Sequence, residues 1–251
     1  MTERSLSGQV AVITGASSGL GRATAVALAQ AGADVALTAR ALEDLELVAA
    51  EVRGVGERAL VVPGDLASAD VAERVVSSAV DAFGRIDVLV NAAGTDVPGP
   101  VAELPTEAWD RVMQVNLRAP FLLGQAAFRH MRAAGRGTIV NVSSVAGKRG
   151  WANAAAYCAS KFALTGLTQA FAAEARAHGI RVCVLYPGAM DTSWGTWSPV
   201  ERREAHRDAP PRTQALAPER VAELIVWIAA APPELVLNEV VVSPLEEEGW
   251  P

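Results

Sequence analysis

The stretch that decides the fold runs from residue 10 to residue 40 and reads VAVITGASSGLGRATAVALAQAGADVALTAR. It predicts a strand, a glycine-rich turn, a helix and a second strand. Gly15 can take the sharp turn after the strand, Gly19 lets the backbone approach a phosphate, and Gly21 lets the helix lie close to the sheet. Because the first amides of a helix lack partners inside it, they attract anions. The stretch therefore indicates a dinucleotide-binding unit, or alternatively a tight turn that holds no ligand.

The alternation of apolar runs and longer helical segments continues along the chain. Apolar runs occupy residues 10–14, 34–39, 59–65, 86–94, 137–144 and 180–188. They are nearly continuous, which is typical of strands buried on both faces of a parallel sheet. We predict an α/β fold in which a doubly wound parallel sheet carries helices on both faces. Since 251 residues suit one such unit, we expect a single domain over residues 1–251.

Composition argues against several other classes of protein. The net charge is −6 and the basic residues are scattered, so we expect no nucleic-acid partner and no anionic membrane surface. No apolar run approaches the length of a membrane span, and the N-terminus lacks the pattern of a signal peptide, so we expect a soluble cytoplasmic protein. Cys158, Cys183 and the three histidines are dispersed, and we therefore expect no metal site.

One segment interrupts the alternation of apolar runs and helical segments. From about residue 190 to residue 218, charged residues and prolines interrupt the pattern. Segments of this kind are usually functional lids or solvated loops. We predict an excursion that leaves the sheet at 190–218 and contributes to a substrate site.

Further motifs follow the glycine turn in a fixed order. TGASSGLG at 14–21 precedes NAAG at 91–94, Asn116, NVSS at 141–144 and YCASK at 157–161. With this ordered set, the chain resembles the short-chain dehydrogenase/reductase family, in its single-domain branch. The resemblance covers the chain from Val10 to about Val242. It implies a Rossmann-like fold and a hydride transfer between a nicotinamide cofactor and a carbonyl or alcohol substrate.

Tyr157 and Lys161 stand four residues apart in an alanine-rich run, and a helix places such residues on one face. A phenol ordinarily has a pKa near ~10, and a neighbouring cation favours the phenolate. We therefore expect Lys161 to lower the pKa of Tyr157 toward the operating pH. The resemblance implies that Tyr157 is the general acid/base and that Lys161 also bonds the nicotinamide ribose.

Two other polar residues complete the expected catalytic set. Ser144 stands at a strand end, and the resemblance implies that its hydroxyl stabilises charge on the substrate oxygen. Its alternative role is a hydrogen bond to local backbone. Asn116 would, by resemblance, hold a water that links Lys161 to solvent, and its alternative role is that of a helix N-cap.

The resemblance also implies a set of cofactor-binding positions. Asp65 would hold the adenine amino group and Thr192 the nicotinamide carboxamide, although either side chain could simply form a local turn. Ala39 stands where NAD-specific relatives carry an acid, and Arg40 follows it. We therefore expect NADP(H) to be preferred, with NAD(H) as the alternative. The full set is Gly15, Ser17, Gly19, Leu20, Gly21, Arg40, Asp65, Leu66, Asn91, Ala92, Gly94, Tyr157, Lys161, Pro187, Gly188 and Thr192.

The substrate itself is not specified by the sequence. Tryptophans near the expected site favour an apolar or aromatic substrate, but they could instead pack onto the protein. The expected substrate wall consists of Ser144, Trp151, Asn153, Trp194 and Trp197. Two alternative functions stay open, namely a nucleotide-sensing protein without catalysis and an epimerase or dehydratase of the same family.

Two segments carry apolar residues on more than one face, namely residues 117–131 and 154–175. One face can cover the sheet, and the other needs a partner. The resemblance implies that these helices pair with their copies in a homotetramer or a dimer. The chain ends in an acidic stretch with Trp250, whereas relatives often end in a glycine-rich motif, so the second interface of a tetramer is the less secure of the two.

Overall fold

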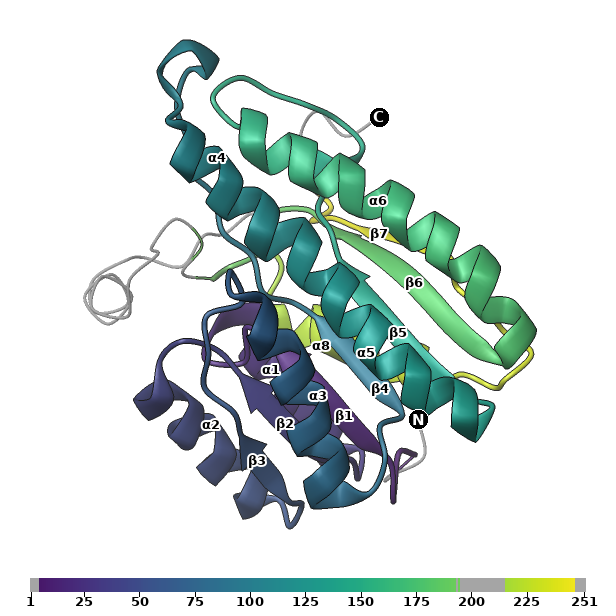
Figure 1. Cartoon of the computed structure of the whole chain (residues 1–251). Coiled ribbons are helices and arrows are strands. Elements are labelled where there is room, and N and C mark those ends of the chain that lie inside the picture. The colour runs from purple at the N-terminus through teal and green to yellow at the C-terminus, as the bar shows by residue number, and fades with distance from the viewer. Residues whose placement is uncertain (1–4, 193, 195–214, 247–251) are drawn as a thin grey trace.

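The computed structural model describes residues 5–192, 194 and 215–246 (Figure 1). Within these residues, the strands form one sheet in the order β3-β2-β1-β4-β5-β6-β7, and every pairing is parallel. The strands are β1 (Val10–Thr14), β2 (Asp34–Thr38), β3 (Ala59–Val61), β4 (Val88–Asn91), β5 (Gly137–Val142), β6 (Ile180–Pro187) and β7 (Glu239–Val242). Each of the six predicted apolar runs contains one strand, and the predicted doubly wound parallel sheet is confirmed.

Helices cover both faces of the sheet, as Figure 1 shows for α5 and α6 in front and α8 behind. The described α-helices are α1 (Gly19–Gln30), α2 (Leu42–Gly54), α3 (Ala69–Phe83), α4 (Thr106–Met113), α5 (Ala119–Ala134), α6 (Ala155–Ala175) and α8 (Pro218–Ala230). Three short 3₁₀ turns, η1 (Val101–Glu103), η3 (Val145–Gly147) and η4 (Arg176–His178), lie among the described connections. A π-helical turn, η2 (Gln114–Arg118), joins α4 to α5.

The pleat of the strands divides the interior into two cores. Ile13 of β1 faces a core that it shares with α1, α2 and α8, whereas Val12 faces a core shared with α3 and α5. The same alternation recurs in β4, where Val90 and Leu89 point to opposite sides. Because successive strand residues point to opposite faces, a strand covered on both sides must be apolar throughout. This requirement explains the continuous apolar runs of the sequence.

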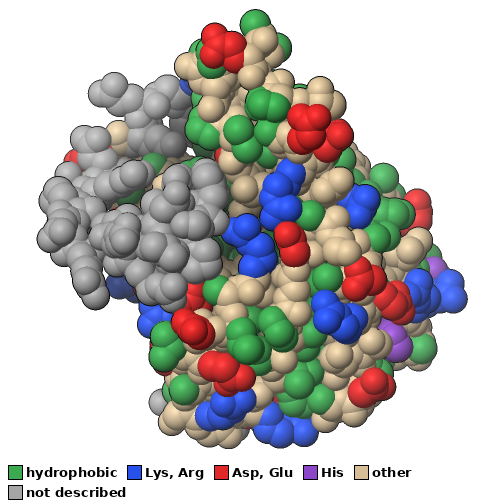
Figure 2. All heavy atoms as spheres, turned by 60° about the vertical axis from the view of Figure 1, so that its left-hand side comes forward, with side chains coloured by type: hydrophobic (Ala, Val, Ile, Leu, Met, Phe, Trp, Pro, Cys, Tyr) green, Lys and Arg blue, Asp and Glu red, His purple; other side chains and the backbone are tan. Residues whose placement is uncertain are grey.

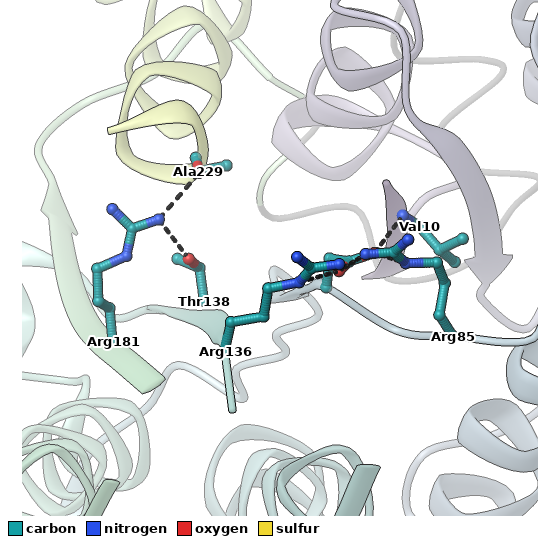
Figure 3. Close-up of polar contacts among 7 residues, drawn as sticks. Val10, Arg85, Arg136, Thr138, Arg181 and Ala229 are labelled. Atoms are coloured by element: carbon teal, nitrogen blue, oxygen red, sulfur yellow. Dashed lines mark hydrogen bonds and ion pairs between the residues drawn. The ribbon is translucent and has the colours of Figure 1, made fainter. Parts of the chain in front are cut away.

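Polar contacts hold the end of the sheet where the strands begin. The buried Asp87 carboxylate accepts the Val10 amide at 3.0 Å and two hydrogen bonds from Arg85 at 2.7 Å. Arg136 approaches the same carboxylate at 3.7 Å. Figure 3 shows the guanidinium groups of Arg136 and Arg85 pointing toward one another. This buried charge is compensated by several donors, as a buried carboxylate requires.

A third arginine at this end of the sheet holds the end of α8. The guanidinium of Arg181, on β6, donates to the carbonyl of Ala229 at 3.0 Å and to the hydroxyl of Thr138 at 2.8 Å (Figure 3). It also donates to the carbonyl of Ala231 at 2.7 Å. The last carbonyls of a helix have no partner inside it, and a cation is favourable there. Arg181 therefore ties α8 to the sheet.

The two ends of the predicted excursion at 190–218 meet. Met190 and Leu216 form an isolated parallel bridge, the amide of Asp191 donates to Leu216 at 2.9 Å, and the amide of Leu216 donates to Ala189 at 2.9 Å. Most of the excursion, with Trp197, lies outside the described residues. Its described ends therefore start and finish beside the carboxyl end of β6.

The surface in Figure 2 mixes acidic and basic side chains rather than collecting one sign in a large patch. No helix in the described ranges combines the length and the apolar character that crossing a bilayer requires. The same ranges contain no group of three or more His, Cys, Asp or Glu side chains arranged to hold a metal ion.

Candidate active site

A cavity of about 430 Å³ lies at the carboxyl ends of the strands. The strand order reverses between β1 and β4, and ligands of open α/β sheets bind at such a point. The volume is in the range of small-molecule sites. Of the sequence-predicted residues, those that line the cavity are Gly15, Ser17, Gly19, Leu20, Gly21, Arg40, Asp65, Leu66, Ala92, Gly94, Ser144, Trp151, Tyr157, Lys161, Pro187, Gly188, Thr192 and Trp194.

The glycine turn has no room for side chains at two of its positions. A Cβ on Gly15 would lie 2.9 Å from Cα of Ala93, and Gly15 has a φ of +67°. A Cβ on Gly21 would lie 2.2 Å from the Gly15 carbonyl oxygen. At Gly19, the side chain of Thr192 stands 3.4 Å from the position of a Cβ. The turn thus packs against the end of β4 on one side and Thr192 on the other, and this cradle of bare backbone at the start of α1 fits a dinucleotide pyrophosphate.

Three of the four expected catalytic side chains meet at the cavity wall. Tyr157 and Lys161 lie on α6 one helical turn apart, and Nζ of Lys161 is 5.6 Å from the centre of the Tyr157 ring. Tyr157 forms a hydrogen bond with the Ser144 hydroxyl. Nζ of Lys161 donates to the Val142 carbonyl at 2.8 Å, which fixes the ammonium at the end of β5. The spacing on α6 brings Tyr157 and Lys161 together, and the end of β5 places Ser144 beside them.

The protein groups around Tyr157 raise the pKa of its phenol, contrary to the predicted lowering. Burial raises the pKa of the phenol above its ordinary value, and the hydrogen bond with Ser144 only partly opposes this. Burial also lowers the pKa of Lys161 to about 8. Desolvation disfavours the charged form of each group, so the pair is shifted toward neutral Tyr157 and neutral Lys161. The sequence argument considered only the attraction between charges and therefore missed the cost of burying them.

Ser144 also makes the local backbone contact that was its alternative role. Its Oγ accepts the Ala146 amide at 3.1 Å and caps η3. The preceding Ser143 is buried, and its hydroxyl donates to the Lys161 carbonyl at 3.2 Å. The two serines are therefore used differently, because only Ser144 bonds with the Tyr157 phenol.

Asn116 is fully buried behind the cavity wall rather than part of it. It is not a helix N-cap, since it lies inside the π-helical turn η2. Its Oδ1 accepts the Thr95 amide at 2.9 Å, and its Nδ2 donates to the Thr95 carbonyl at 2.8 Å and to Ser160 Oγ at 3.0 Å. Ser160 Oγ donates in turn to the Tyr157 carbonyl at 2.7 Å. Asn116 thus connects the loop after β4 to the helix that carries Tyr157.

The far end of the cavity carries a carboxylate between arginines. Asp65 accepts the Ala67 amide at 3.0 Å and Nη2 of Arg111 at 3.0 Å. Burial alone would raise the pKa of Asp65, but the Ala67 amide, Arg111 and the charge of Arg40 together lower it. Arg40 and Arg111 both line the cavity, so this end combines one carboxylate with two guanidinium groups. The sequence analysis did not include Arg111, because nothing near it in the sequence indicates a partner 46 residues away.

The expected substrate wall is only partly assembled. The ring of Trp194 lies 5.1 Å from the ring of Tyr157, and Trp151 lines the same cavity. Asn153 does not line it. Its φ is +63°, and its carbonyl accepts the Gly99 amide at 2.9 Å. Asparagine tolerates this left-handed conformation better than most residues, so its position in the loop before α6 has a backbone explanation.

Asn91 lies behind the cavity rather than in its wall. Its Nδ2 donates to Asn141 Oδ1 at 2.8 Å, and this bond joins β4 to β5 side chain to side chain. Asn141 Nδ2 donates in turn to Thr168 of α6 at 2.9 Å. These linked side chains therefore hold α6 against the centre of the sheet.

The fold and the cavity define a nucleotide-binding α/β protein, and comparison with known proteins identifies its family. The sequence profile described as "short chain dehydrogenase" matches residues 9–199. A curated relative, cis-4-hydroxycyclohexanecarboxylate dehydrogenase of Sinomonas cyclohexanicum, is 40% identical over 233 residues, which are 92% of this chain and 93% of the relative. The chain belongs to the short-chain dehydrogenase/reductase family.

Solved structures agree with this assignment. A metagenomic short-chain oxidoreductase in complex with NADP has a TM-score of 0.83 and 38% sequence identity, and the match covers 97% of this chain and 100% of that one. An alcohol dehydrogenase from the archaeon Thermococcus sibiricus, complexed with 5-hydroxy-NADP, has a TM-score of 0.87 and 28% identity, with 96% and 99% covered. The protein is therefore an oxidoreductase of a family that binds NAD(P).

Proposed function

We propose that the protein is an NADP(H)-preferring carbonyl reductase or alcohol dehydrogenase in which Tyr157 exchanges the proton on the substrate oxygen. The observation that carries the proposal is the meeting of Tyr157, Ser144 and Lys161 at the wall of one cavity. The glycine turn lies at the other side of the same cavity, so a bound dinucleotide and a substrate can meet there.

Each side chain has a definite part in this proposal. The Tyr157 phenol donates its proton to the carbonyl oxygen during reduction and accepts it during oxidation. The Ser144 hydroxyl donates to the same oxygen and stabilises the charge that develops on it. Lys161 supplies the positive charge that favours the phenolate. A nicotinamide cofactor held by the glycine turn would supply the hydride for reduction and accept it in oxidation.

Asn116 has a positioning role in the same scheme. Both of its Nδ2 hydrogen bonds go to protein groups, and its Oδ1 accepts one amide. An amide oxygen has two lone pairs, so Oδ1 keeps one for the water of the proposed proton relay to Lys161.

Replacing Tyr157 with phenylalanine tests the proton-transfer role. We expect Tyr157→Phe to lower kcat at least about a hundredfold, because general acid/base catalysis contributes factors of that size, while the dissociation constant of NADPH stays nearly unchanged. The assay follows NADPH absorbance with a panel of ketones and aldehydes, and calorimetry gives the dissociation constant. The control is Tyr186→Phe, which alters the only other tyrosine. A Tyr157→Phe variant as active as the wild type would refute the proposal.

The preference for NADP(H) rests on the end of β2. Ala39 provides no carboxylate for the ribose hydroxyls, and the following residue, Arg40, also lines the cavity. A guanidinium forms strong, often bidentate bonds with a phosphate. The two solved relatives named above were found with NADP or a derivative of it, which supports the same preference.

Kinetics with the two cofactors test this preference. A charge-assisted hydrogen bond contributes ~1.5–3 kcal/mol, so Arg40→Ala should lower kcat/KM for NADPH roughly ten- to a hundredfold and change that for NADH little. Ala39→Asp should shift the preference toward NADH, because its carboxylate repels the phosphate. Equal losses with both cofactors in Arg40→Ala would mean that Arg40 does not recognise the phosphate.

A further inference from the structure

The charged side chains of the cavity are divided between its two ends. Of the described residues that line the cavity, four carry a charge, namely Arg40, Asp65, Arg111 and Lys161. Lys161 lies beside Tyr157, whereas the other three lie together at the far end. Two guanidinium groups and one carboxylate leave that end with one net positive charge. The proposed function uses Arg40 but not Arg111.

The strand order places the far end and Tyr157 on opposite sides of the glycine turn. Arg40 and Asp65 follow β2 and β3 on one side of β1, whereas Ser144 follows β5 on the other side. The glycine turn follows β1 itself. If the turn holds a dinucleotide whose reacting ring lies at Tyr157, the far end is the place left for the adenosine half. The two nicotinamide cofactors differ only in that half, because NADP(H) carries a 2′-phosphate on the adenosine ribose.

Arg111 pairs with Asp65, which is the only carboxylate among the described residues of the cavity wall. Nη2 of Arg111, on α4, donates to both carboxylate oxygens of Asp65, at 3.2 and 3.0 Å. Burial alone would raise the pKa of Asp65, but the Ala67 amide, Arg111 and the charge of Arg40 lower it, so this carboxylate is ionised at neutral pH. An ionised carboxylate repels a phosphate, and the guanidinium at 3.0 Å opposes that repulsion.

Stability alone does not account for an ion pair at this place. The side chains of Arg111 and Asp65 are 39% and 44% exposed, and pairs exposed to this degree contribute little to the free energy of unfolding. A pair in the wall of a ligand cavity does, however, change the electrostatic potential that a charged ligand meets. A phosphate monoester carries nearly two negative charges at neutral pH, so it responds strongly to this potential.

We propose that Arg111 is a specificity-determining residue for the 2′-phosphate of NADP(H), because its charge cancels that of Asp65 and leaves the charge of Arg40 for the phosphate. This inference rests on the proposed function and explains how the same site distinguishes its two cofactors. Without Arg111, the Asp65 carboxylate would cancel the charge of Arg40 instead, and the far end would have no net charge.

Calorimetry with NADP⁺ and NAD⁺, without substrate, tests the inference in the absence of turnover. The measured preference is the Kd for NAD⁺ divided by the Kd for NADP⁺. Contacts with the adenine base are common to both cofactors and cancel in this ratio, as does a general loss of packing. Arg111→Met removes the charge and keeps a long side chain, and it should lower the preference about tenfold. Arg111→Lys keeps the charge and should hold the preference within about twofold of the wild type.

Replacing Asp65 should change the preference in the opposite direction. Asp65→Asn leaves both guanidinium groups uncompensated, so it should raise the preference at least about threefold. In the double variant with Arg111→Met, Arg40 alone supplies the charge, and the far end again carries one net positive charge. The preference should therefore return to within about twofold of the wild type. A purely structural role for Arg111 does not predict this return.

Arg129→Met is the matched control. Arg129 forms an exposed ion pair with Glu73 between α5 and α3, and neither residue lines the cavity. We expect this variant to keep the wild-type preference. Salt provides a second check, because the difference between the wild type and Arg111→Met should shrink in about 1 M sodium chloride, where the Debye length is only ~3 Å.

The outcomes separate this inference from the proposed function. If Arg111→Met weakens the binding of both cofactors equally, or of neither, the inference is overturned while the proposed function stands. If Tyr157→Phe retains full activity, or if the wild type binds both cofactors equally, the proposed function fails. The inference would then still require Arg111→Met to shift binding toward NAD⁺.

Discussion

At the scale of single residues, Lys161 has the most unusual surroundings. Its side chain is buried, and its ammonium has one hydrogen bond, to the Val142 carbonyl. Burial lowers its pKa to about 8 from an ordinary value of 10.5. Between these two values the folded protein binds fewer protons than the unfolded chain, so the free energy of unfolding rises as the pH rises from about 8 to 10.5. Protonated Lys161 thus destabilises the folded protein.

This sign gives a prediction for Lys161→Met. The free energy of unfolding of the variant minus that of the wild type should be highest below pH ~8 and fall as the pH approaches ~10.5, because the variant has no buried charge to neutralise. Urea unfolding followed by circular dichroism over this pH range measures the difference. Lys148→Met is the control, because Glu239 raises the pKa of Lys148 and its contribution stays constant up to about pH 10. Identical pH profiles for the two variants would contradict the prediction.

The residues of the site differ in how far the sequence could predict them. Tyr157 and Lys161 were predictable because helix periodicity places them together, and Gly15 and Gly21 because a turn and a close helix require them. Arg111 was not predictable. Its role depends on its ion pair with Asp65, which lies 46 residues away. A pairing between such distant residues leaves no local pattern in the sequence.

At the scale of elements, α8 depends on one arginine from the sheet. Its C-cap, Ala231, is not a glycine in the left-handed region, and Arg181 bonds the carbonyls of Ala229 and Ala231 instead. Arg181→Ala should lower the free energy of unfolding by about 2–4 kcal/mol, since several partly buried acceptors lose a charged donor. Urea unfolding of the wild type and the variant measures this loss.

An exposed arginine of α8 itself provides the comparison. Arg220 pairs with Glu223 at the exposed start of α8. Exposed pairs contribute little, so Arg220→Ala should change the free energy of unfolding by no more than about 0.5 kcal/mol. If the two alanine variants prove equally unstable, the capping role of Arg181 is wrong.

Each of the six predicted apolar runs contains a strand. Five of these strands are buried almost throughout, whereas β3 lies at the edge of the sheet and is only half-buried. The seventh strand, β7, escaped prediction. It has only four residues, Glu239 followed by three valines, and these alternate between exposed and half-buried at the edge of the sheet. The π-helical turn η2 also escaped prediction, because its extra residue shows in backbone hydrogen bonds rather than in residue types. The sequence predicted a role for Asn116 in the site, but it did not predict that Asn116 lies inside a π-helical turn.

At the scale of the whole molecule, α4, α5 and α6 present an apolar surface without a described partner. A hollow there is lined by Met113, Leu117, Phe121 and Leu167, among others. Phe121 and Phe162 are 45% and 47% exposed. Exposed apolar patches of this kind commonly mark interfaces. We expect this surface to pair with its copy in a dimer or a tetramer.

Charge substitutions on this surface test the assembly. Phe121→Glu and Phe162→Glu should each weaken self-association at least about a hundredfold, because each buries an unpaired charge at the interface. Light scattering after size-exclusion chromatography at micromolar concentration gives the mass. Leu47→Glu on α2 is the control, since Leu47 is also exposed but lies on another helix. A wild-type protein that is a monomer under these conditions rules out the proposed interface.

The strand order also bears on how the chain is made. Parallel neighbours cannot be joined by a hairpin, so each pairing waits for a crossover segment to be synthesised. The central strand β1 gains β2 early, but its other neighbour, β4, begins only at Val88. During translation the growing sheet therefore exposes in turn the open edges of β1, β4, β5 and β6. The last of these edges is covered only when Glu239–Val242 emerges to pair with β6. Since unpaired edges recruit other chains, a ribosome that stalls before residue 239 leaves a nascent chain in which the edge of β6 is open and prone to aggregation.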